Sequence, residues 1–208
     1  MSDTAGSAPA AAEVTIAGRR TPMVLSVTRC LREGIERGTR IPDGSRTVAL
    51  LSATDAQRAY VTFSGGEVVV AADATGDPDV TWQVRWPDPV PSDSPGDDFA
   101  QAVERLLSGG DADWREAAEG FWKRTSALAG MPSGLHVLCA DDGSEAVVGD
   151  LQPEGQGVLG TAAALTGFFS GRSTLIEALE GGEFGINVSF PVFSVLLGAN
   201  LKVVCGEL

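Results

Sequence analysis

Apolar and polar residues follow two different periods along the chain, which predicts a mixture of helices and strands. Residues 23–37 carry apolar side chains at spacings of three and four, the pattern of an amphipathic helix. Short apolar runs at 48–51, 59–63 and 67–70 then predict strands, and the Ser-Gly-Gly between the last two predicts a hairpin turn. Residues 80–86 alternate between apolar and polar, so a fourth strand is expected there.

The middle of the chain is predicted to be helical. Residues 87–98 are rich in Pro and Asp and predict a loop, and Asp98 at its end is the expected N-cap of a helix that reaches Leu107. A second helix is expected at 111–128, where large apolar side chains form one broad stripe. The chain therefore passes from strands to helices before strands return.

The last third repeats this order of elements. The pattern predicts three strands, two helices separated by a Ser-Gly-Arg break, a closing strand and a final helix with Pro191 in its first turn. The whole chain thus predicts an α+β (α/β) fold, a mainly antiparallel sheet with helices on one face. The expected bounds are 135–140, 145–148 and 157–159 for the three strands, 161–169 and 173–180 for the helices, and 184–190 for the closing strand.

Two short segments recur within the chain and indicate an internal repeat. Residues 102–108 (AVERLLS) match 164–170 (ALTGFFS) at an offset of 62, and both are followed by Gly. Residues 116–120 (EAAEG) match 177–181 (EALEG) at an offset of 61. The expected organisation is a disordered tail at 1–13 and two related halves at 14–112 and 113–208.

These segments also carry a resemblance to a known family. Residues 78–81 (PDVT), the helix from Asp98 and the closing portion 165–197 are similar to the sterol carrier protein 2 family of small lipid-binding domains, here in a tandem or duplicated form. The first copy departs from the family pattern, because 121–127 (FWKRTSA) is helix-like where the family has its last strand. The resemblance implies an apolar tunnel under the sheet that accepts fatty acyl chains, sterols or similar molecules.

The Phe-rich end of the chain is the candidate site. Five of the eight Phe lie between positions 168 and 193, and so much apolar surface must face a core, a ligand or a partner. Ordinary core packing is one interpretation, and a ligand cavity, which the resemblance favours, is the other. The residues expected to line or close the cavity are Phe168, Phe169, Leu175, Ile176, Leu179, Phe184, Ile186, Phe190 and Phe193. Their expected first-half counterparts are Trp82, Trp86, Phe121 and Trp122.

The expected function is non-enzymatic binding or transfer of an apolar small molecule such as a lipid, sterol or fatty acyl chain. The alternative is a protein-interaction or assembly module, as a homodimer or with a protein partner, in which the same fold fills its core with its own side chains. A net charge of −13 argues against nucleic acid as a partner, because phosphate binding needs a basic face.

Other features of the sequence predict the compartment. No apolar run approaches the roughly 18 residues of a membrane span, so no stable membrane insertion is expected. The N-terminus is acidic where a signal peptide is basic, and the three Cys make no disulfide framework. These features predict a cytoplasmic protein.

Catalytic motifs are sparse. His136 is the single His, and Cys139 falls on the opposite face of the same expected strand, so a Cys–His nucleophile pair is not expected. Residues 155–160 match the dinucleotide pattern G-x-G-x-x-G, although Val158 and Leu159 fit a strand better. An enzyme that uses this loop with NAD(P) is the third interpretation. We expect no catalytic residue, no metal and no cofactor.

Overall fold

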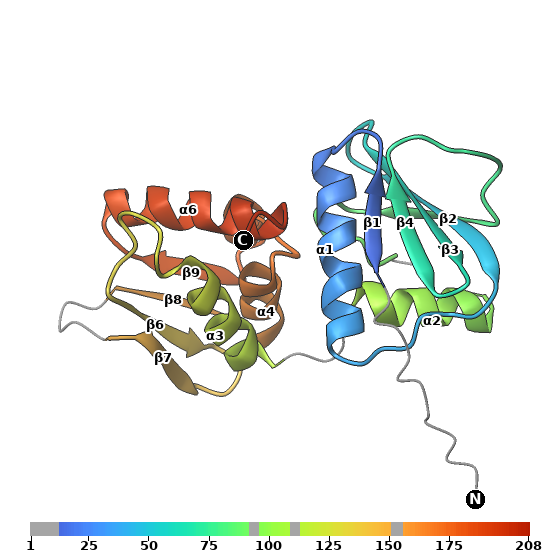
Figure 1. The fold of residues 1–208 in the computed structure, drawn as a ribbon. Coiled ribbons are helices and arrows are strands. Elements are labelled where there is room, and N and C mark those ends of the chain that lie inside the picture. The colour runs from blue at the N-terminus through green and yellow to red at the C-terminus, as the bar shows by residue number, and fades with distance from the viewer. Residues whose placement is uncertain (1–12, 92–95, 109–112, 151–155) are drawn as a thin grey trace, which may run out of the picture.

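The computed structural model describes residues 13–91, 96–108, 113–150 and 156–208 and has an α+β fold with two sheets (Figure 1). The tail predicted at 1–13 lies outside the described residues, apart from Glu13. Each sheet carries helices on one face, and the two layers so formed lie side by side (Figure 1).

The first sheet is an antiparallel meander with one parallel strand added at each side. Its strands are β1 (Val14–Ala17), β2 (Ser45–Ser52), β3 (Arg58–Ser64), β4 (Glu67–Ala71) and β5 (Val80–Val84). They lie in the order β1-β4-β3-β2-β5. The predicted hairpin turn joins β3 to β4, and its Gly65 and Gly66 have φ angles of 59° and 89°, which a two-residue turn of this kind requires.

Both sheets are mixed, and the parallel pairs of the first were not predicted: β1 pairs parallel to β4 and β5 parallel to β2. Asp79 fixes the second of these pairs. Its N–H donates to the carbonyl oxygen of Thr47 at 2.9 Å, and its carboxylate accepts from the N–H of Thr47 at 2.7 Å. The chain that leaves β4 therefore returns beside β2 in the same direction and does not form a further hairpin.

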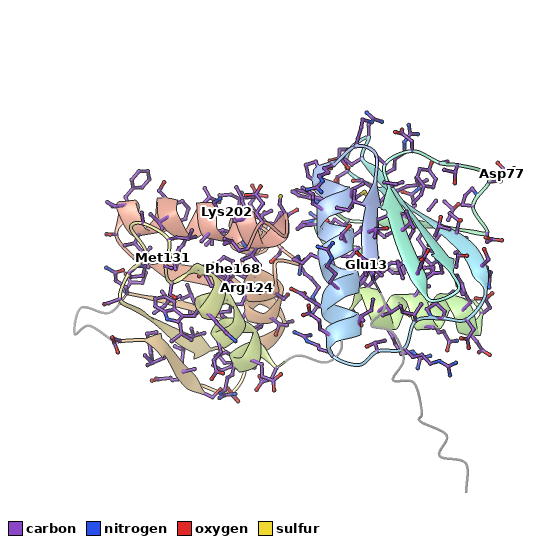
Figure 2. All side chains as sticks on the ribbon, in the orientation of Figure 1. Glu13, Asp77, Arg124, Met131, Phe168 and Lys202 are labelled. Carbon is purple, nitrogen blue, oxygen red and sulfur yellow. The ribbon has the colours of Figure 1, made fainter. Side chains whose placement is uncertain are left out.

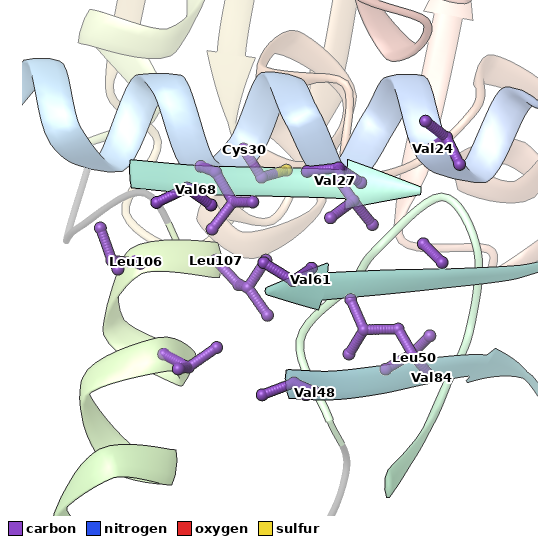
Figure 3. Close-up of a cluster of buried hydrophobic side chains, with 14 of the residues drawn as sticks. Val24, Val27, Cys30, Val48, Leu50, Val61, Val68, Val84, Leu106 and Leu107 are labelled. Carbon is purple, nitrogen blue, oxygen red and sulfur yellow. The ribbon is translucent and has the colours of Figure 1, made fainter. Parts of the chain in front are cut away.

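Helices α1 (Pro22–Glu36) and α2 (Asp98–Leu107) complete the first layer. Their apolar sides meet the inward side chains of the sheet in one buried cluster, of which Figure 3 shows the central part. The N-cap of α2 is Asp97 and not Asp98: its backbone is extended, and its carboxylate accepts from the N–H of Ala100 at 2.8 Å. Gly34 lets α2 approach α1, because a Cβ there would overlap the backbone oxygen of Leu106.

The second sheet also combines a hairpin with a parallel strand. Its strands are β6 (Gly134–Cys139), β7 (Glu145–Gly149), β8 (Gly157–Gly160) and β9 (Phe184–Asn187). They lie in the order β7-β6-β8-β9, with β6 antiparallel to β7 and parallel to β8. Strand β2 of the first sheet is paired in the same way, because it is antiparallel to β3 and parallel to β5.

Four helices belong to the second layer: α3 (Trp114–Thr125), α4 (Ala162–Ser170), α5 (Leu175–Glu180) and α6 (Phe190–Val204). The strand predicted at 184–190 is shorter, since β9 ends at Asn187 and Ser189 is the N-cap of α6. Pro191 explains the difference, because proline has no N–H for a sheet and suits the first turn of a helix.

The buried apolar residues form two clusters that divide along the sequence. The first draws on residues 14–107 and the second on residues 114–203. Polar contacts join them: Arg29 of α1 donates to the carbonyl oxygens of Ser170 and Gly171, and Arg124 of α3 pairs with Glu33 of α1. Descent of the two halves from one ancestral unit stays a prediction.

Candidate functional site

Four phenylalanine rings from three elements meet in the second cluster. Ring centroids of Phe168 and Phe169 in α4 lie 4.9 Å apart, and Phe184 of β9 lies 4.9 Å from Phe168. Phe121 of α3 lies 5.5 Å from both rings of α4. Each such pair adds about 0.5–1.5 kcal/mol beyond the burial of its surface. These rings fill the interior around Phe168, which Figure 2 labels.

Asn200 holds the break between α4 and α5 against this aromatic cluster. Its side chain is fully buried in α6, donates to the carbonyl oxygens of Phe168 and Ser173 at 3.0 and 3.1 Å, and accepts from the N–H of Leu175 at 2.9 Å. Gly171 ends α4 with a φ angle of 72°, a conformation that glycine adopts without strain. Thr174 then starts α5 with a capping box.

The nine residues predicted to line a cavity fall into three groups. Phe168, Phe169, Leu175 and Phe184 are buried core, Leu179, Ile186 and Phe193 are partly buried against that core, and Ile176 and Phe190 are exposed. None of the nine lines the cleft between the halves described below. A ligand cavity at these residues stays a prediction.

The expected first-half counterparts divide between the two clusters. Trp82 belongs to the first cluster, and Trp86 is partly buried against it. Phe121 and Trp122 were placed wrongly, because α3 packs on α4 and both side chains belong to the second cluster. The sequence does carry a signal for this, since the Gly-Gly after α2 separates α3 from the first half.

An apolar stripe on α6 is a feature that the prediction missed. Phe190, Phe193, Leu197 and Leu201 follow one another at spacings of three and four along the helix, and we call them the α6 stripe. Phe190 is 81% exposed and Leu201 41% exposed, and the rings of Phe190 and Phe193 stack at 6.3 Å. Phe190 was assigned to the closing strand, so the helical spacing of the stripe was hidden.

An open cleft of about 1050 Å³ lies between the two halves. Charged residues of both signs line it, among them Arg85, Asp88, Arg172 and Glu177. Burial raises the pKa of Asp88, and a hydrogen bond from the N–H of Val90 and the positive charges of Arg172 and Arg29 oppose this rise. Five carboxylates and two arginines line the cleft, so its charged side chains are mostly negative.

The residues with possible catalytic chemistry lie apart. His136 Nε2 lies 3.0 Å from Glu145 Oε2 on the outer face of the second sheet, whereas Cys139 is buried on the inner face. Gly155 lies outside the described residues, and Gly157–Gly160 is the strand β8, so its backbone groups pair with neighbouring strands instead of forming a phosphate loop. Across the described ranges, no group of three or more His, Cys, Asp or Glu could hold a metal ion.

In comparisons with known proteins, no protein-family model, no curated protein and no solved structure matches the chain. Among the helices of the described residues, none has the length and hydropathy needed to cross a bilayer.

Proposed function

We propose that the protein is a non-catalytic interaction module that binds a partner protein through the α6 stripe. The observation that carries this proposal is the 81% exposure of Phe190 at one end of the stripe, with the half-exposed Leu201 at the other. A stripe of this length and spacing matches an apolar groove or a second amphipathic helix on a partner. Full burial of one such side chain contributes roughly 1.5–3 kcal/mol.

Apolar exposure is concentrated in the second half. Every large apolar side chain that is exposed among the described residues lies between Val147 and Leu208. Lys202 is the only charged residue of α6, so the outer side of this helix has little other than apolar surface to offer to solvent. Concentrated apolar surface of this kind marks interaction sites on soluble proteins.

The charge of the chain favours a basic partner over a second copy. The net charge of −13 makes two copies repel each other and attracts a protein with Lys or Arg around its apolar groove. The close packing of the four Phe rings supports the alternative in which the fold fills its core with its own side chains.

The test compares two double variants, each of which replaces two exposed apolar residues by Ser, on different surfaces of the protein. Phe190→Ser with Leu201→Ser removes the exposed ends of the α6 stripe, and Val147→Ser with Leu159→Ser removes apolar surface from the outer face of the second sheet. A partner captured by the wild type is identified by mass spectrometry, purified and titrated by calorimetry. We expect the α6 variant to lose binding and the sheet variant to keep it, with affinity that falls as salt rises.

Two outcomes would overturn the proposal of a basic protein partner. Light scattering that shows a dimer, dispersed by the α6 variant, would assign the stripe to a second copy of the chain. Equal binding of the identified partner by both double variants would remove the stripe from the interface.

A second candidate function is binding of an apolar small molecule beside the aromatic cluster. The observation that favours it is the partial burial of Leu179, Ile186 and Phe193, which form an apolar rim against that cluster. Native mass spectrometry of the purified protein tests it, with a lipid-sized added mass as the expected result. The larger side chain of Ile186→Trp would compete with a ligand beside the cluster and abolish the added mass, whereas a spectrum of bare protein would end this candidate.

A further inference from the structure

Four arginines line one small cavity where the two halves meet. The cavity has a volume of about 300 Å³ and is lined by residues of α1, the segment after β1, α3 and the end of the chain after α6. Arg20, Arg29, Arg32 and Arg124 line it together with two carboxylates, Glu33 and Glu36. We call this the arginine cavity. At about 30 Å³ for each water molecule, it has room for roughly ten waters or for a small ligand of similar size.

The charges in the arginine cavity do not balance. Glu33 is shared, because its two carboxylate oxygens each lie 2.9 Å from a guanidinium nitrogen, one of Arg29 and one of Arg124. Counted over side chains alone, four guanidinium groups therefore face two carboxylates and leave an excess of two positive charges. This local excess of positive charge contrasts with the net charge of −13 of the whole chain.

Arg29 also has a hydrogen-bond donor without a partner. The residue is only 6% exposed, and its two terminal nitrogens donate to Glu33 and to the carbonyl oxygens of Ser170 and Gly171. Its Nε is buried and has no partner. A buried donor that stays unsatisfied costs free energy, which adds to the unfavourable surroundings of this guanidinium group.

We propose that the arginine cavity binds a small dianion that carries a phosphate group. Guanidinium groups match the geometry of phosphate oxygens and bind them with charge-assisted hydrogen bonds. Two negative charges would balance this excess, and the exposed guanidinium groups of Arg20 and Arg32 can donate to phosphate oxygens in the cavity. The phosphate belongs either to a free small molecule or to a lipid headgroup, since both present the same oxygens.

The test uses inorganic phosphate and glycerol 3-phosphate as probes in calorimetry of the full chain at constant ionic strength. Arg20→Gln with Arg32→Gln removes the two exposed arginines of the cavity and spares Arg29 and Arg124, which join the halves. Arg58→Gln, an exposed position on β3 outside the cavity, is the matched control for loss of charge. We expect the double variant to weaken phosphate binding by about tenfold or more and the control to leave it unchanged.

The results also assign the source of the phosphate. Co-sedimentation with phosphatidylcholine vesicles that contain phosphatidic acid, abolished in the double variant, assigns the group to a lipid headgroup. Binding of the soluble probes without binding to vesicles assigns it to a free molecule. Absence of binding up to about 10 mM probe, equal binding by the double variant, or an equal affinity for chloride would overturn the proposal. Circular dichroism and the melting temperature of the double variant show whether it is folded, and a folded variant is required for the comparison.

Discussion

The guanidinium of Arg29 in α1 donates to the carbonyl oxygen of Ser170 at the end of α4, over a distance of 2.5 Å and a separation of 141 residues. Carbonyl oxygens in the last turn of a helix have no partner within that helix, so this contact satisfies one of them. The same end of the helix carries partial negative charge, which a guanidinium group stabilises. Arg29 thus caps a helix of the second half from the core of the first.

Replacement of Arg29 by Met should therefore destabilise the protein. The variant leaves the carbonyl oxygens of Ser170 and Gly171 without their buried donor, and we expect a loss of about 3–5 kcal/mol in the free energy of unfolding. Urea denaturation measures it. Arg40→Met is the control, because its pair with Asp43 is largely exposed and its loss should have no measurable effect. Equal stabilities for both variants would show that the cap contributes nothing.

Asn200→Ala should loosen the join between α4 and α5. Three buried backbone groups lose their partner, and an unsatisfied buried group costs about 1–3 kcal/mol. We expect a loss of about 3 kcal/mol and a weaker near-ultraviolet circular dichroism signal from the aromatic cluster. Ser194→Ala, at an exposed position on the same helix, should change neither, and a similar change in both variants would contradict the role of Asn200.

Gly34→Ala and Gly120→Ala should change stability in opposite directions. A Cβ at Gly34 meets the backbone of Leu106, so α1 and α2 must move apart at a cost of about 1–3 kcal/mol. A Cβ at Gly120 in α3 has no atom within 4 Å, and the higher helix propensity of Ala should stabilise by about 1 kcal/mol. Thermal unfolding of both variants gives the comparison, and a shift of equal sign would contradict the close approach.

Cys30 should make stability depend on pH in the alkaline range. Burial raises the pKa of this thiol from 9.0 to about 11, with a smaller opposing effect of Arg29. The folded state thus holds the proton more tightly than the unfolded state, so the contribution is complete below pH 9.0 and is lost as pH rises towards about 11. The loss should reach about 3 kcal/mol. Unfolding in urea at a series of pH values measures it, and Cys30→Ala should flatten this part of the profile while Cys205→Ala should leave most of it.

Most elements of the fold follow from local sequence patterns, but β1 was not predicted, and the parallel pairing of the strands was not predicted either. The spacing of apolar residues predicted α1 within one residue at each end, and the Ser-Gly-Gly turn predicted the β3–β4 hairpin. The parallel partners β1 and β8 have only four residues each, and contacts distant in sequence decide where they pair.

The candidate site was predicted only in part, because Phe168 and Phe190 give the same signal in a sequence. Both are large, apolar and close to other Phe, yet one is buried and the other is exposed. Phe190 is exposed because it lies at the start of α6 and not in the strand. The sequence does not mark this start clearly, because the strand-like alternation before Phe190 overlaps with the helical spacing that begins there. The arginine cavity left no local signal, since Arg29 and Arg124 come together only when the halves meet.

The division of the two buried clusters along the sequence has a consequence for synthesis. Every residue of the first cluster precedes every residue of the second in the sequence. The ribosome therefore synthesises all residues of the first core before any residue of the second. The partners of Arg29 at the end of α4 are synthesised more than a hundred residues later, so this guanidinium group lacks them until the second half has been made. The nascent chain can thus acquire its first domain early and reach its final rigidity late, when the last turn of α4 meets that guanidinium.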